Sequence, residues 1–167
     1  MEGKEEAKKE TKKGPVAGDE SLMSQKKNGT ADKPPMKPLR WACDWETANR
    51  ICCFNRHYAE HSGYFRTTKW PKEVAQDKPT IYYDCISGKP LFKAPVGRSF
   101  KDFYNESIAH GWPSFRDEEV IWDDVRVLKN GETVSTCGNH LGHNLPDKNG
   151  NRYCINLVSI AGTPPTE

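Results

Sequence analysis

The pattern of apolar and polar residues predicts a series of short strands in the second half of the chain. Residues 80–83, Thr-Ile-Tyr-Tyr, are rich in β-branched and aromatic side chains, which favour strands. Two further β-rich runs, residues 124–128 and 133–136, are separated by a stretch that contains Asn130-Gly131. Because Asn-Gly is a strong signal for a tight turn between antiparallel strands, we expect a hairpin there. A last strand is predicted over residues 152–160.

Apolar residues three or four positions apart predict two helices, each with a start signal. Asp44 is a common capping residue, and the apolar stripe after it consists of Trp45, Ala48, Ile51 and Cys52. Ser99 stands three residues before Asp102, as in a capping box, and the stripe that follows consists of Phe100, Phe103, Tyr104 and Ile108. Gly111 is expected to end this second helix. Many short strands with a few short helices predict a mainly β fold with antiparallel pairing.

Residues 1–38 differ in composition from the rest of the chain. Lys, Glu, Gly, Ser and Pro dominate them, and they contain no aromatic residue. Such a segment has too little apolar surface to offset the entropy lost on ordering. We therefore predict a disordered tail over residues 1–38 and one folded domain over residues 39–167, which is large enough to bury a core.

Charge and hydropathy exclude several classes of function. The formal net charge is +2, with both signs interleaved, which predicts no nucleic-acid partner. No apolar run reaches the length of a membrane span, and the charged start does not resemble a signal peptide, so we expect no membrane partner and a cytoplasmic protein. Thiols stay reduced in that compartment, so the six cysteines are expected to be reactive or incidental, not a disulfide framework.

The predicted last strand carries a candidate nucleophile. Side chains two apart on a strand share a face, so Arg152, Cys154 and Asn156 are presented together. A nearby cation favours the thiolate, which is the nucleophilic form of cysteine. The structural alternative is that Cys154 is one more small, buried, hydrophobic side chain.

Two other clusters are candidates for chemistry. His140 and His143 follow Cys137, and such residues can bind a metal, donate protons or form local hydrogen bonds. Zinc is disfavoured, because no second pair of ligands stands at zinc-site spacing. Residues 111–115, Gly-Trp-Pro-Ser-Phe, hold Trp112 in a Pro-containing turn, where it is either core or the wall of a small apolar pocket.

The order of these clusters resembles the signature of the methionine-R-sulfoxide reductases, the MsrB or SelR family. The matching segments are Ser87-Gly88-Lys89-Pro90-Leu91-Phe92, then residues 111–115, then His140-Leu141-Gly142-His143, then residues 152–156. The resemblance implies a fold of two antiparallel sheets with a few short peripheral helices. It also implies site roles: Cys154 as the nucleophile, Arg152 supporting its thiolate, Trp112 and Phe115 binding substrate, and His140, His143 and Asn156 polarising and protonating the sulfoxide oxygen.

The implied reaction reduces methionine R-sulfoxide, in proteins or as the free amino acid. Attack by Cys154 leaves a sulfenic acid, a second thiol condenses with it, and thioredoxin or a similar dithiol reduces the disulfide. The alternative is a non-catalytic domain that uses the same pocket to bind oxidised methionine.

The sequence departs from the family in two places. Many members hold a structural zinc with four cysteines, and those positions read Asp84, Ser87, Val134 and Cys137 here, so we expect no zinc and no other cofactor. Many members also place the resolving cysteine immediately before the Gly-Trp-Pro-Ser-Phe motif, where this chain has His110. We expect Cys53, or else Cys52, to take that role. The aromatic and His-rich residues 50–70 are expected to form a packed edge of the domain, with a substrate-recognition surface as the alternative.

Overall fold

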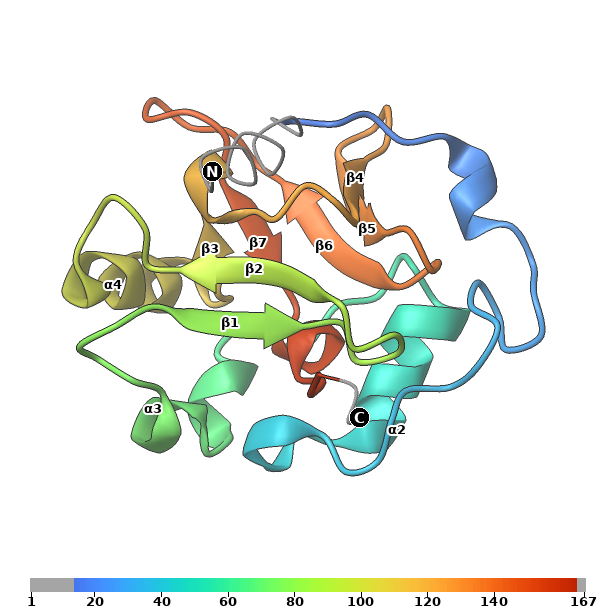
Figure 1. Ribbon diagram of the computed structural model, residues 1–167, viewed down its shortest axis with the longest axis horizontal. Helices are drawn as coiled ribbons and strands as arrows, with labels where there is room; N and C mark the ends of the chain where they lie inside the picture. The colour runs from blue at the N-terminus through green and yellow to red at the C-terminus, as the bar shows by residue number, and fades with distance from the viewer. Residues whose placement is uncertain (1–13, 165–167) are drawn as a thin grey trace, which may run out of the picture.

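Two antiparallel sheets form the centre of the protein in a computed structural model, which describes residues 14–164 (Figure 1). The first sheet pairs β1 (Thr80–Tyr83) with β2 (Pro90–Ala94). The second has the strand order β3-β7-β6-β5-β4, with the bounds β3 Ser114–Phe115, β4 Val125–Val127, β5 Glu132–Ser135, β6 His140–Asn144 and β7 Tyr153–Ile155. The expected fold class, mainly β with two antiparallel sheets, is confirmed.

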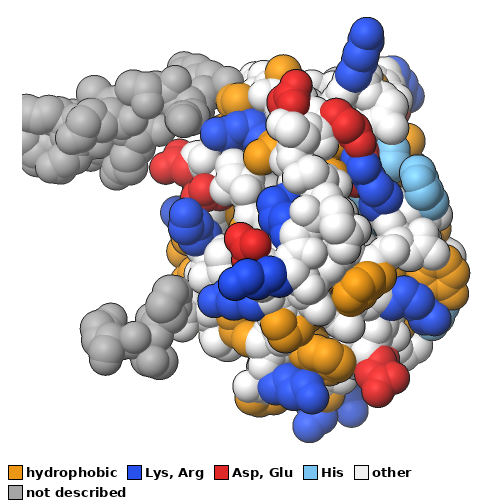
Figure 2. Space-filling view, turned by 90° about the vertical axis from the view of Figure 1, so that its right-hand side faces the viewer, with side chains coloured by type: hydrophobic (Ala, Val, Ile, Leu, Met, Phe, Trp, Pro, Cys, Tyr) orange, Lys and Arg blue, Asp and Glu red, His pale blue; other side chains and the backbone are white. Residues whose placement is uncertain are grey.

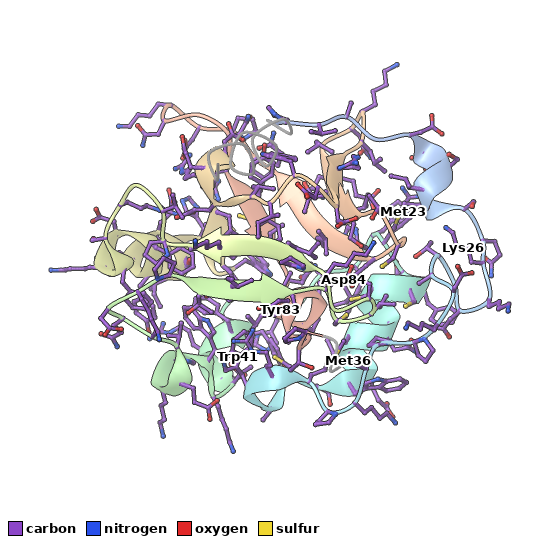
Figure 3. All side chains as sticks on the ribbon, in the orientation of Figure 1. Met23, Lys26, Met36, Trp41, Tyr83 and Asp84 are labelled. Carbon is purple, nitrogen blue, oxygen red and sulfur yellow. The ribbon has the colours of Figure 1, made fainter. Side chains whose placement is uncertain are left out.

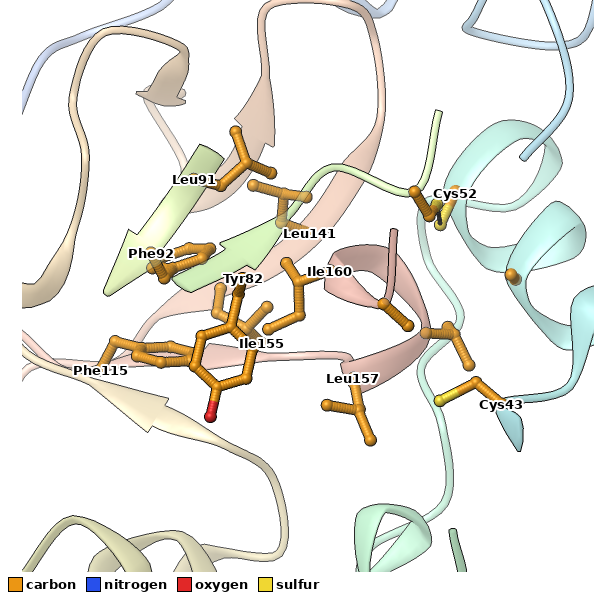
Figure 4. Close-up of a cluster of buried hydrophobic side chains, with 14 of the residues drawn as sticks. Cys43, Cys52, Tyr82, Leu91, Phe92, Phe115, Leu141, Ile155, Leu157 and Ile160 are labelled. Atoms are coloured by element: carbon orange, nitrogen blue, oxygen red, sulfur yellow. Dashed lines mark hydrogen bonds between the residues drawn. The ribbon is translucent and has the colours of Figure 1, made fainter. Parts of the chain in front are cut away.

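The core contains apolar side chains from both sheets (Figure 4). Phe92 of β2 stacks on Phe115 of β3 with ring centroids 4.4 Å apart, and Tyr82 of β1 meets the edge of the same Phe115 ring at 5.4 Å. Leu141 of β6 and Ile155 of β7 belong to the same cluster and are 0% exposed. Burying each large apolar side chain stabilises the fold by roughly 1.5–3 kcal/mol, so this packing fixes the position of the two sheets relative to each other.

Short helices surround the sheets, and both predicted helix starts are confirmed. Asp44 accepts a hydrogen bond from Thr47 N at 2.9 Å, and Ser99 accepts one from Asp102 N at 3.0 Å. Gly111 ends the longer helix with a left-handed φ of 92°, which glycine adopts easily. The helices are α2 (Trp45–Asn49), α3 (Trp70–Glu73) and α4 (Phe100–His110), the π-helical turn η3 (Arg50–Phe54), and the 3-10 turns η1 (Glu20–Met23), η2 (Arg40–Ala42), η4 (Tyr64–Thr67), η5 (Asp117–Glu119) and η6 (Leu157–Ile160).

The last strand is shorter than the pattern predicts. β7 ends at Ile155, and the apolar residues after Asn156 form η6 instead of continuing the strand to residue 160. The partner strand explains the difference: Gly142 pairs with Ile155, and β6 begins only two residues earlier, at His140. The chain beyond residue 157 therefore has no strand to pair with, and it buries its apolar side chains in a compact turn.

Residues 14–38 contradict the expectation of a disordered tail. Val16 and Gly18 exchange backbone hydrogen bonds with Val127 of β4, and Thr30 N donates to Cys53 O at 2.8 Å. Met23 is 5% exposed and Ala31 is 0% exposed; Figure 3 labels Met23 beside η1. The segment contains few apolar residues, but these are buried and its backbone is hydrogen-bonded to the domain. The part of the expected tail before residue 14 lies outside the described residues.

The surface agrees with the interleaved charge of the sequence. On the face shown in Figure 2, Lys and Arg side chains lie among Asp and Glu side chains. Among residues 14–164, no helix has both the length and the apolar character needed to cross a membrane.

The packing of the N-terminal segment can be tested at a glycine. A Cβ at Gly138 would lie 1.9 Å from Thr30 O, whereas a Cβ at Gly97 would meet no atom within 4 Å, and both residues have positive φ. In urea unfolding we expect Gly97→Ala to cost the roughly 1–2 kcal/mol of a left-handed alanine. Gly138→Ala should cost clearly more, because it also separates Thr30 from the turn. Equal losses would show that residues 14–38 do not pack as described.

Candidate functional site

Cys154 lies at the centre of β7, between two paired strands. It is opposite Ser114 of β3 and opposite His143 of β6. Its Sγ accepts a hydrogen bond from Arg152 Nη1 at 2.8 Å and lies 3.8 Å from Ser114 Oγ. The half-buried thiol faces a pocket of about 320 Å³, lined by Arg56, His57, Tyr58, Ala59, Trp112, His140, Gly142, His143, Leu145, Cys154 and Asn156.

The ionisation of Cys154 depends on two opposing effects. Burial raises the pKa of the thiol above its ordinary value, and the charge of Arg152 and the hydrogen bonds from Ser114 and Arg152 only partly oppose this. Asp147 Oδ2 lies 3.5 Å from Arg152 Nε, an ion-pair contact without a hydrogen bond. Arg152 thus favours the thiolate, as the shared strand face predicted, but the resting pocket keeps the sulfur mostly protonated near neutral pH.

Glu132 and Arg56 fix the orientation of His140. His140 Nδ1 lies 2.7 Å from Glu132 Oε2, and Arg56 Nη2 donates to the other oxygen of the same carboxyl at 2.6 Å. Burial alone would raise the pKa of Glu132, but the hydrogen bonds from His140 and Arg56 lower it overall. An ionised carboxylate only accepts hydrogen bonds, so Nδ1 of His140 carries a proton, and Nε2 is the nitrogen left for a substrate.

The surroundings of His143 determine its charge. It is half-buried, and burial and the neighbouring His140 lower the pKa of its imidazole, with Glu132 partly opposing. The two rings lie 6.4 Å apart between centroids. His143 is therefore neutral near neutral pH, and the two histidines are suited to different roles.

Glu60 holds Trp112 and Asn156 through its backbone. Trp112 Nε1 donates to Glu60 O at 3.2 Å, and Glu60 N donates to Asn156 Oδ1 at 3.0 Å. Asn156 Nδ2 donates to Leu141 O at 3.0 Å. Since an amide nitrogen carries two hydrogens, Asn156 keeps one donor for a ligand in the pocket.

Most predicted site residues come together, and three do not. Trp112, His140, His143, Cys154 and Asn156 line the pocket, and Arg152 contacts Cys154. Phe115 is 0% exposed and packs in the core, because its side chain points to the opposite side of β3 from Ser114. Cys52 and Cys53 are buried at 1% and 2% exposure and do not line the pocket; Cys52 Sγ lies 3.6 Å from Cys85 Sγ.

The sequence pattern missed the wall formed by residues 56–59, together with Glu60 and Glu132. Residues 50–70 were expected to be a packed edge, with a substrate-recognition surface as the alternative, and part of this region borders the pocket. A local signal near Glu132 was the Asn-Gly turn directly before it, but that turn joins β4 to β5, whereas Glu132 pairs with His143 of β6. We find no comparable local signal for Arg56 or Glu60.

The residues at the family's zinc positions do not fit a zinc ion. Val134 is apolar and buried, and Cys137 Sγ instead donates to Asp84 Oδ2 at 3.2 Å. Asn139 Nδ2 donates to the other oxygen of Asp84 at 2.9 Å. Structural zinc needs four N, O or S ligands, and no group of three His, Cys, Asp or Glu residues within 14–164 is arranged to hold a metal. Hydrogen bonds join the two loops here; Figure 3 labels Asp84 beside β1.

Comparison with known proteins identifies similar sequences. The SelR domain model matches residues 66–164. A protein of Leifsonia xyli subsp. xyli described as "Peptide methionine sulfoxide reductase MsrB" is 32% identical over 110 residues, which cover 59% of this chain and 73% of that protein. The match to the SelR domain model begins after the pocket-wall residues 56–59 and includes the three sequence clusters around Trp112, His140 and Cys154.

The balance between burial and Arg152 predicts a measurable thiol titration. The pH dependence of Cys154 alkylation, followed by peptide mass spectrometry, should have a midpoint above the roughly 8.5 of a free cysteine. Arg152→Ala should move the midpoint further up, because the lowering influence is lost while burial remains. Arg66→Ala, at an exposed arginine that does not line the pocket, is the control. An unchanged or lower midpoint in Arg152→Ala would contradict the described contact.

Proposed function

Because the chain belongs to the SelR (MsrB) family of methionine sulfoxide reductases, we propose that it reduces the R epimer of methionine sulfoxide by nucleophilic attack of Cys154. The observation that carries this proposal is the contact of Cys154 with Arg152 in a pocket that also presents Trp112 and the two histidines. A nucleophile, a cation beside it, proton donors and an aromatic wall are the groups that the reaction needs.

The proposed chemical step transfers the sulfoxide oxygen to Cys154. The thiolate attacks the sulfoxide sulfur while a proton reaches the oxygen, methionine leaves as the thioether, and Cys154 becomes a sulfenic acid. In its imidazolium form, with Nδ1–H held by Glu132, His140 can deliver that proton from Nε2. His143 and the free N–H of Asn156 polarise the oxygen, and Trp112 contacts the substrate methyl group.

The mouth of the pocket favours protein-bound over free substrate. Tyr58 and Leu145 both line the pocket and are 44% and 46% exposed, which is unusual for large apolar side chains in this molecule. Residues flanking an oxidised methionine in a polypeptide would cover them. A free amino acid has no such residues.

The nucleophile is tested with separated epimers. Wild type should reduce a blocked methionine R-sulfoxide with dithiothreitol and leave the S epimer unchanged, and Cys154→Ser should lose the activity while keeping its melting temperature. Cys137→Ser, which keeps a hydroxyl for the contacts to Ser135 and Asp84, should stay active. Binding of the R epimer without turnover by wild type would support the non-catalytic alternative instead.

The resolving step requires a local rearrangement if Cys53 or Cys52 takes part. Both thiols are buried, and burial, followed by the neighbouring Cys52, raises the pKa of Cys53 to about 12. They lie in the π-helical turn η3, directly before the pocket wall, and π-helical turns often mark functional sites. We propose that η3 opens after oxidation of Cys154, and that thioredoxin or a similar dithiol then reduces the new disulfide in the cytoplasm, where such dithiols are kept reduced.

Peptide mapping tests this step. After oxidation by one equivalent of substrate, Cys154 should be joined to Cys53 or Cys52. The Cys52→Ser, Cys53→Ser double variant should lose thioredoxin-linked turnover and still release one methionine per chain. If the double variant keeps its thioredoxin-linked rate, an external thiol resolves Cys154 directly and η3 does not need to open.

A further inference from the structure

We propose that Glu60 is a positioning residue that fixes Trp112 and Asn156 relative to Cys154. The inference rests on the proposed function, because it assigns these two side chains to substrate binding. Glu60 does not line the pocket and precedes the residues that match the family model. It touches the site only through hydrogen bonds.

All three polar groups of Glu60 bond to segments that carry the site. Its carbonyl oxygen accepts from Trp112 Nε1, and its N–H donates to the side chain of Asn156. Its carboxyl Oε2 accepts from Val158 N at 2.8 Å, at the start of the turn that follows Asn156. Nearby, Gly63 N donates to Gly111 O at 2.8 Å, immediately before Trp112.

The side chain is what anchors the backbone of Glu60. Residues 55–59 have no regular secondary structure, so few backbone bonds hold the chain on that side. The carboxyl bond to Val158 ties Glu60 to the same short segment that its N–H holds through Asn156. Without that bond, the carbonyl that orients Trp112 would have fewer constraints, and the aromatic wall could shift away from Cys154.

The carboxyl sits in an unusual environment for an acid. It is 4% exposed, and its second oxygen, Oε1, has no hydrogen-bond partner among the described residues. Burial raises the pKa of Glu60 to about 8, while the backbone N–H groups of Val158 and Leu157 oppose this. The facing titratable groups are Cys43 and Tyr64. Burial raises the pKa of Cys43, and the charge of Glu60 adds to this. Burial also raises the pKa of Tyr64 to about 12, although the hydrogen bond from Asp44 N partly opposes it. All three side chains are therefore neutral near pH 7.

This environment gives Glu60 a pH dependence with a defined sign. Its pKa in the folded protein lies above its unfolded value, so its contribution to stability is complete below about pH 4.5 and is lost as pH rises through about 8. Above that pH a buried charge without a cationic partner replaces the neutral acid. The carboxylate accepts more strongly from Val158 N, but the uncompensated charge favours conformations in which the side chain reaches water, so the segment should loosen and substrate binding should weaken.

Two variants and one control separate positioning from general stability. Glu60→Gln keeps a neutral acceptor for Val158 N and should bind substrate like wild type at pH 7. Glu60→Ala removes the acceptor and should raise KM for blocked methionine R-sulfoxide roughly tenfold, the effect of about one hydrogen bond, with a smaller change in kcat. Val125→Ala, a buried apolar truncation in β4 away from the pocket, should lower the melting temperature without changing KM.

A pH series keeps the inference testable if Glu60→Ala does not fold. The Kd of blocked R-sulfoxide, measured by calorimetry in a Cys154→Ser background to remove thiol titration, should rise above pH 8 with Glu60 present. It should stay flat with Glu60→Gln. The same alkaline rise in both backgrounds, or an unchanged KM in a folded Glu60→Ala, would overturn the inference alone. Absence of wild-type turnover would overturn the proposed function and the inference together.

Discussion

The pairing of β7 with β6 on one edge and β3 on the other is the constraint on which the site depends. It places Cys154 opposite His143 and Ser114 and leaves Arg152 two residues away on the same face. The apolar core beneath, shared by both sheets, prevents a slip in register, because a shift of one residue would turn every side chain to the other face. The two loops where the family resemblance would place zinc ligands are joined by the hydrogen bonds of Asp84 to Cys137 and Asn139.

Burial creates an electrostatic conflict at the site. A buried thiol resists ionisation, and Arg152 only partly compensates, so the reactive thiolate forms at a cost. The same burial excludes water and strengthens the contacts among His140, Glu132 and Arg56. In the proposed reaction, the sulfur of Cys154 must be ionised at the same moment as the sulfoxide oxygen needs a proton donor. Burial therefore hinders the first requirement, and it helps the second by holding His140 in place.

Local signals in the sequence predicted local structure well. Strand β1, the hairpin at Asn130-Gly131 and the helix caps at Asp44 and Ser99 depend on neighbouring residues only, and all are confirmed. The predicted extent of the last strand was wrong, because the strand ends where its partner strand begins. The prediction of a disordered tail was wrong for residues 14–38. Hydrogen bonds to distant backbone groups hold this segment on the domain, although it is poor in apolar residues.

In the candidate site, too, the sequence predicted contacts between residues that are near each other in the chain and missed contacts between distant ones. Strand periodicity placed Arg152 beside Cys154 and put Asn156 at the pocket. Arg56 and Glu60 could not be found, because their partners lie far away in the sequence, and Phe115 was taken for a pocket residue although alternation along β3 sends it to the core.

The transfer of the sulfoxide oxygen to Cys154 can be followed with an isotope. Methionine R-sulfoxide labelled with oxygen-18 would be mixed with the reduced Cys52→Ser, Cys53→Ser double variant without any reductant, so that neither proposed resolving thiol consumes the sulfenic acid. The sulfenic acid would then be trapped with a reagent that retains its oxygen. We expect labelled oxygen on the peptide that contains Cys154, with one equivalent of methionine released. Methionine release with the label on another cysteine, or no release from the R epimer, would contradict it.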